Sequence, residues 1–211
     1  MPFYSPTLAG LGTMRPRLVI FFTLFLQLLL VSAGLVNRTI DDTYGDIVTK
    51  VMVEYTDNWN VEPGCTGCGV QPESSQAYFG TWHDTTTNVP NKTEPHSATL
   101  KFNGTCHWLS SSAKCTSWQR TRHIGTAVWI YCILVNSAGP EITIFTNITF
   151  EVDGVLAGTY HHIPDSAQAQ YLYNVSVFQK TDMSQQEHVL VMSAMQGSEP
   201  SLLLFDYAVY T

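Results

Sequence analysis

Apolar and polar residues alternate with a period of two along most of the chain beyond residue 35, and no long segment follows a helical period. Because successive side chains of a strand point to opposite faces, this alternation predicts strands with one buried face. Nine segments show the alternation or a short apolar run, namely residues 47–55, 77–81, 98–102, 126–135, 142–152, 155–161, 171–178, 188–194 and 202–210. Asp153-Gly154 stands between two of them and predicts a tight hairpin.

The number and spacing of these segments predict an all-β protein with an antiparallel β-sandwich. Short strands that recur about every ten residues, separated by turns, are typical of two packed sheets. Residues 128–135 are apolar throughout, which predicts a central strand buried on both faces. We expect one domain over residues 35–211, which is long enough to bury a substantial core.

Residues 1–34 have the features of a secretory signal peptide. Arg15 and Arg17 precede an apolar run over 18–31, and the small residues Ser32-Ala33-Gly34 follow it. The run is shorter than the ~20 apolar residues of a comfortable membrane span. We therefore expect a secreted, extracellular protein with no membrane span in the mature chain. The alternative is a chain tethered to the membrane by an uncleaved signal anchor.

Sequons and charge agree with an extracellular location. Five N-glycosylation sequons begin at Asn37, Asn91, Asn103, Asn147 and Asn174. Beyond residue 34 the chain keeps 8 of its 10 Lys and Arg and all 17 Asp and Glu, so its formal charge is −9. This charge disfavours nucleic acid and anionic membranes as partners.

The cysteines predict one small disulfide. Cys65 and Cys68 stand in loop sequence, with neither a helix start after them nor a second ligand pair at zinc spacing. A disulfide that pins this loop suits an oxidising compartment. Cys132 lies in an apolar segment and is expected to be a buried free thiol.

Residues 105–125 form an unusual insertion. They contain no acidic residue in an acidic chain, and their removal joins Phe102-Asn-Gly directly to Thr126-Ala-Val-Trp-Ile-Tyr131 as one strand-like segment. Suitable codons at Gly104 and Ile124 would create in-frame splice signals. We therefore expect a retained intron, and the alternative is a genuine loop.

With this insertion set aside, the chain resembles a group of extracellular proteins of mushroom-forming fungi. The matching segments are Thr39-Ile-Asp-Asp-Thr-Tyr-Gly-Asp46, Trp59, Cys65-x-x-Cys68, Gly80-Thr-Trp-His-Asp84, Phe102-Asn-Gly, Thr126-Ala-Val-Trp-Ile-Tyr131, Phe150-Glu-Val-Asp-Gly154, Tyr173-Asn-Val-Ser-Val-Phe178, Glu187-His-Val-Leu190 and Phe205-Asp-Tyr-Ala-Val-Tyr210. The resemblance implies a galactose-binding-like jelly roll, the fold of many carbohydrate-binding modules. Such proteins often continue into a transmembrane helix, so the end at Thr211 implies a soluble form or a truncated sequence.

Trp59, Trp82, His83 and Asp84 are the candidate ligand-binding residues. Aromatic rings stack on the apolar faces of sugars, and a few polar groups fix the hydroxyls. The alternative places Trp82 in the core and Asp84 as the cap of a turn.

Asp41 and Asp42 are candidates for calcium binding, and turn and cap chemistry is the alternative for them. Beyond these two, we expect no metal site and no cofactor. Patterns typical of hydrolases, metalloproteases or phosphate-binding loops do not occur in the sequence.

The favoured function is non-catalytic binding of carbohydrate or of a cell-wall or other extracellular surface. The alternatives are a small secreted polysaccharide hydrolase and a purely structural ectodomain of a cell-surface protein.

Overall fold

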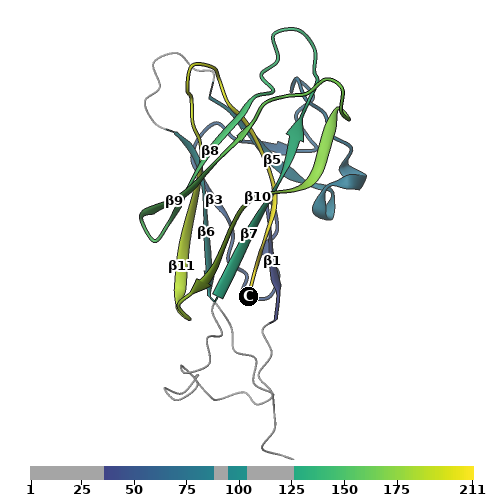
Figure 1. Ribbon diagram of the computed structural model, residues 1–211. Coiled ribbons are helices and arrows are strands. Elements are labelled where there is room, and N and C mark those ends of the chain that lie inside the picture. The colour runs from purple at the N-terminus through teal and green to yellow at the C-terminus, as the bar shows by residue number, and fades with distance from the viewer. Residues whose placement is uncertain (1–35, 88–94, 104–125) are drawn as a thin grey trace, which may run out of the picture. The chain divides into compact units, whose positions relative to one another are not determined.

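The computed structural model describes residues 36–87, 95–103 and 126–211. Two antiparallel sheets form a sandwich (Figure 1). The strands are β1 (Arg38–Asp41), β2 (Gly45–Asp46), β3 (Glu54–Tyr55), β4 (Asn60–Glu62), β5 (Trp82–Thr86), β6 (His96–Asn103), β7 (Thr126–Val135), β8 (Thr146–Val152), β9 (Val155–His162), β10 (Tyr171–Met183), β11 (Glu187–Ala194) and β12 (Leu202–Tyr210). Two short 3-10 turns, η1 (Ser74–Gln76) and η2 (Tyr78–Gly80), precede β5.

The first sheet has the order β10-β7-β12-β1-β2, and β5 and β4 extend it beside the first half of β12. The second sheet has the order β3-β6-β11-β8-β9. Every strand pair is antiparallel. The predicted fold class, an antiparallel β-sandwich, is therefore confirmed.

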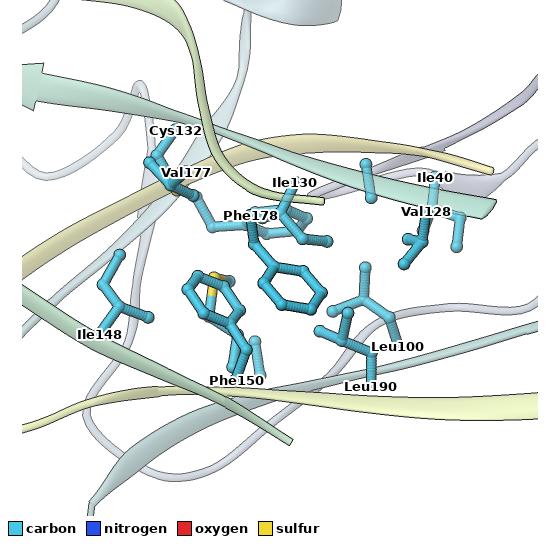
Figure 2. Close-up of a cluster of buried hydrophobic side chains, with 14 of the residues drawn as sticks. Ile40, Leu100, Val128, Ile130, Cys132, Ile148, Phe150, Val177, Phe178 and Leu190 are labelled. Carbon is cyan, nitrogen blue, oxygen red and sulfur yellow. The ribbon is translucent and has the colours of Figure 1, made fainter. Parts of the chain in front are cut away.

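The main core fills the space between the two sheets (Figure 2). Ile130 and Phe178 come from the first sheet, and they face Phe150 and Leu190 from the second. The rings of Phe150 and Phe178 stack with centroids 4.6 Å apart. Burying each side chain of this size contributes roughly 1.5–3 kcal/mol, so alternation along the strands is enough to hold the two layers together.

The central strand is the best-predicted element. β7 has the predicted bounds and lies between β10 and β12. The hairpin is also confirmed, because Asp153 and Gly154 join β8 to β9 with positive φ angles of 55° and 77°. Cys132 is fully buried as a free thiol, and burial raises its pKa well above the ordinary value.

Two of the predicted strands are wrong. Residues 47–53 form no strand, because the Asp46 carboxylate accepts backbone N–H groups of Val48 and Thr49 and closes a turn. Residues 78–80 form η2, and Phe79 there has a left-handed φ of 49°. The strand, β5, begins only at Trp82.

The segments on either side of 105–125 are two strands and not halves of one. β6 ends at Asn103 in the second sheet, and β7 begins at Thr126 in the first. The apparent continuity in sequence therefore marks a crossing between the layers. Residues 105–125 themselves, like 1–34 and Asn91, lie outside the described residues, and the retained intron stays a prediction.

Candidate ligand-binding pocket

A polar pocket of about 530 Å³ opens at the end of the sandwich where β12 begins. β12 runs from Leu202 at the pocket to Tyr210 near the C-terminus, which is marked C at the lower end of the coloured strands in Figure 1. Side chains or backbone of five segments line the pocket, namely Asn58 and Asn60, Cys65 and 67–70, Asp84 and Thr86, His96, and Glu141, Ile142 and Thr143, with Leu202 at the base of β12.

Asp84 is, together with His96, the most deeply buried polar residue of the pocket. It is 4 % exposed and stands opposite Asn60 in the pairing of β4 with β5. Its Oδ2 accepts one long hydrogen bond of 3.4 Å from Asn60 Nδ2, and its Oδ1 has no partner among the described residues. Burial raises the pKa of Asp84 to about 6. The carboxylate thus retains unused capacity to accept a hydrogen bond.

The loop after β4 builds one wall of the pocket. A disulfide joins Cys65 and Cys68, as predicted. The buried carboxylate of Glu62 fixes the start of this loop, because Oε2 accepts the N–H groups of Gly64 at 2.8 Å and Cys65 at 3.1 Å. Gln71 donates from Nε2 to the carbonyls of Cys65 and Cys68, at 2.9 and 3.2 Å.

Gly69 allows this loop to pack closely against the opposite wall. A Cβ atom at position 69 would lie 2.3 Å from Cδ1 of Ile142, which belongs to the loop between β7 and β8. Any larger residue would have to displace Ile142, and the pocket would then change its shape.

The third wall comes from β5 and the start of β6. Thr85 Oγ1 donates to the carbonyl of Asn58 at 2.8 Å and lies 2.6 Å from Nδ1 of His96. These contacts hold the segment before β4 against β5, so Asn58 reaches the mouth of the pocket.

Trp82 does not provide the predicted stacking surface. It is 1 % exposed and belongs to a second apolar cluster with Ile133 and Leu204 on the outer side of the first sheet. Its ring is covered, so it cannot stack on a sugar in this structure, and the expectation is corrected. The structure agrees with the alternative, in which Trp82 is a residue of the core.

His83 and Trp59 also lie away from the pocket. Because β5 alternates its side chains, His83 points to the face opposite Asp84, where its Nδ1 lies 2.7 Å from Asp42 Oδ2. The His83 ring stacks on Tyr55 with centroids 4.1 Å apart, and Tyr55 in turn contacts Trp59. Of the four predicted residues, the structure places only Asp84 in the pocket.

Asp41 and Asp42 take part in turn and cap interactions. Asp41 Oδ1 accepts the N–H groups of Thr43 and Tyr44. Asp42 accepts the Thr81 hydroxyl at 2.7 Å in addition to its contact with His83. Within the described ranges, the one group of three metal-ligand residues with close ligand atoms is Glu62, Cys65 and Cys68, and its sulfurs form the disulfide. Calcium binding by Asp41 or Asp42 stays a prediction.

Sequence reasoning missed most of the pocket. Asn58, Asn60, Thr86 and Thr143 are polar residues at strand ends and in loops, where they resemble ordinary turn residues. The one feature that they share in the sequence is their place at strand ends and in loops, where binding residues often lie because a rigid scaffold holds these segments. The pocket forms only when these separate segments meet in the fold, and no spacing in the sequence predicts that meeting.

Three of the four described sequon residues, Asn37, Asn103 and Asn174, are exposed, and Asn147 in β8 is half-buried. No helix in the part of the chain that the structure describes is long and apolar enough to cross a membrane.

No protein-family model matches this sequence, and no curated protein matches it. Among solved structures, the chain is similar to a family 35 carbohydrate-binding module from Clostridium thermocellum, with 9% identity and a TM-score of 0.39 over 83% of this chain and 97% of that one. It is also similar to the Agl-KA catalytic domain, with 10% identity and a TM-score of 0.43 over 84% of this chain. A GH87 alpha-1,3-glucanase catalytic domain in complex with nigerose matches at 8% identity and a TM-score of 0.35. The matched region spans 28% of each of these two catalytic domains.

Proposed function

We infer that this protein is a secreted, glycosylated, non-catalytic domain that binds carbohydrate, free or as part of an extracellular surface, in the pocket beside Asp84. The observation that carries this proposal is the pocket itself, about 530 Å³ in volume and lined largely by polar groups. This volume falls within the roughly 300–1,000 Å³ of small-molecule sites.

The types of polar group match the chemistry of a sugar. Each sugar hydroxyl donates one hydrogen bond and accepts others, so a saccharide site needs both kinds of partner. Asn58 and Asn60 offer amides, Thr86 and Thr143 offer hydroxyls, and Asp84 offers a carboxylate that uses little of its capacity. Leaving a buried polar group unpaired costs roughly 1–3 kcal/mol, and a ligand hydroxyl at Asp84 would recover part of that cost.

A glycan array probed with the secreted full chain tests this proposal, followed by isothermal titration calorimetry on any sugar that binds. We expect saturable binding that weakens about tenfold or more in Asn60→Ala and Thr86→Val, because each variant removes one hydrogen-bonding group. Glu151→Gln is the control, since Glu151 is exposed on β8 and lies outside the pocket. Binding that survives both pocket variants unchanged would place the sugar elsewhere.

A polysaccharide hydrolase is the second candidate, and one observation favours it. Asp84 and Glu141 line the same pocket, and burial raises the pKa of Asp84 to about 6. Many glycosidases use two carboxyl groups of which one, with a raised pKa, acts as the acid. Release of reducing sugar that disappears in both Asp84→Asn and Glu141→Gln would support hydrolysis over simple binding. Under the proposed function no release occurs.

The extracellular location is part of the proposal. Secretion from eukaryotic cells should yield a mature chain that begins after Gly34, and N-terminal sequencing measures this directly. A retained N-terminus would favour the signal anchor instead. A chain that binds no saccharide in any assay would favour the structural ectodomain.

A further inference from the structure

The pocket has acidic walls. Asp84 and Glu141 contribute two carboxylates, and the buried carboxylate of Glu62 is near enough to raise the pKa of Asp84 further. No lysine or arginine occurs among the described residues that line the pocket. His96 is the one lining side chain there that can become a cation, and its Nδ1 already lies against Thr85 Oγ1.

Asp84 combines burial with a lack of partners. Its neighbour Asn60 supplies a single long contact to Oδ2, and Oδ1 is buried with no partner among the described residues. A buried carboxylate in this state gains most from a charged donor, because a charge-assisted hydrogen bond is about twice as strong as a neutral one. A hydroxyl would satisfy the geometry but would leave the charge uncompensated.

Resting on the proposed function, we propose that the pocket prefers saccharides that carry a free, protonated amine, such as de-N-acetylated hexosamines, and excludes uronic acids. The ammonium group would pair with Asp84 inside the pocket, while Glu141 at the mouth would add attraction. N-acetylation removes the charge and two of the three N–H donors, and a uronate would bring a third anion to these two. At longer range, the overall acidic charge of the domain also attracts cationic sugars and repels anionic ones.

The size of the preference follows from exchanging a neutral hydrogen bond for a charge-assisted one. That exchange corresponds to about tenfold in affinity. We therefore expect a glucosamine tetramer to bind about tenfold more tightly than an N-acetylglucosamine or glucose tetramer. A glucuronic acid tetramer is expected to bind more weakly than any of these.

The experiment is calorimetric titration of the full secreted chain with these four tetrasaccharides at neutral pH. Asp84→Asn keeps the shape of the side chain and removes its charge, so it should reduce the glucosamine affinity to that of the neutral sugars. Glu141→Gln should lower the glucosamine affinity by a smaller factor, because Glu141 is exposed. Glu151→Gln, a matched carboxylate-to-amide change outside the pocket, should change no affinity.

A measurement on the unmodified protein covers the case in which Asp84→Asn fails to fold. Added sodium chloride screens charge pairs, so it should reduce binding of the glucosamine tetramer several-fold and leave the glucose tetramer nearly unaffected. A salt response that is equal for both sugars would contradict the charge argument.

The remaining outcomes separate this inference from the proposed function. Equal affinity for the charged and neutral sugars, or tighter binding of the glucuronic acid tetramer, overturns the inference and leaves saccharide binding intact. Failure to bind all four tetrasaccharides, and every sugar on the array, overturns both.

Discussion

Asp206 in β12 should make the stability of this protein fall as the pH rises towards neutrality. Its side chain is fully buried, with Oδ1 accepting the N–H of Tyr78 at 2.8 Å and Oδ2 left without a partner among the described residues. Burial, together with the nearby carboxylates of Asp42 and Asp41, raises the pKa of Asp206 from 3.8 to about 7. The folded protein therefore holds a proton that the unfolded chain releases near pH 4.

The sign and the magnitude follow from this difference. Between about pH 4 and about pH 7 the folded state binds more protons than the unfolded state, so the free energy of unfolding decreases as the pH rises. At 1.36 kcal/mol per pKa unit, a pKa of about 7 against 3.8 corresponds to at most ~4 kcal/mol. Burial raises the pKa of Asp41 to about 6, so Asp41 and Asp206 take up protons over the same pH range and influence each other. We therefore expect roughly half of that figure, ~2 kcal/mol, from Asp206 alone.

Asp206→Asn isolates this contribution. The amide keeps an acceptor for Tyr78 and carries no charge, so the variant should be more stable than the parent by ~2 kcal/mol at about pH 8 and no more stable at about pH 4. Urea unfolding followed by tryptophan fluorescence across this range measures both. EGTA is included throughout, because a cation held by Asp41 or Asp42 would keep these carboxylates ionised.

Asp57→Asn is the matched control, because Asp57 is exposed. It should give the same difference from the parent at every pH. The reasoning is refuted if Asp206→Asn has a pH-independent effect, or if it lowers the stability above about pH 7.

Three further predictions concern the core, the pocket wall and the surface. Phe150→Ala should lower the free energy of unfolding by about 3–5 kcal/mol because the ring is fully buried, whereas Phe79→Ala, at a position 59% exposed, should change it little, and urea titration compares them. Gly69→Ala should weaken saccharide binding several-fold while shifting the melting temperature by less than about 2 °C, because the new methyl displaces an exposed side chain at the pocket wall; Gly197→Ala, outside the pocket and with its Cβ in ordinary contact 3.6 Å from Asn147 Nδ2, should leave binding unchanged. Ser176→Ala removes the sequon at Asn174 and should reduce the intact mass by one glycan, and a mass lower only by the oxygen atom of the substituted serine would show that this site is unoccupied.

The sequence predicted the sheet interior well because burial there depends on periodicity alone. β7 and β12 match their predicted bounds. Both are long apolar segments, and a position between two neighbouring strands is the arrangement that buries both of their faces. Residues 47–53 show the limit of this reasoning. Their apolar members satisfy a strand pattern, yet the Asp46 carboxylate captures two backbone N–H groups and a turn forms instead.

The site was predicted less completely, because tertiary packing determines which side chains are buried and which of them reach the pocket. Trp82 was expected at the surface from residue type, but its strand face is covered by Val70 and neighbouring residues, so it packs as core. Asp84, two residues further along the same face of β5, lines the pocket, and its role in binding stays a prediction. Its partners come from segments far apart in the chain, and that proximity depends on the fold.

The anchored loop at Cys65 and Cys68 has a consequence for how tightly a ligand is held. The disulfide, the Glu62 carboxylate and the Gln71 amide fix this wall before any ligand arrives, so little chain entropy remains to be lost on association. We therefore expect this wall to be pre-organised, with the same conformation in the free and the ligand-bound protein. Thiol reductants in a purification buffer would free the loop and lower the apparent affinity without unfolding the sandwich.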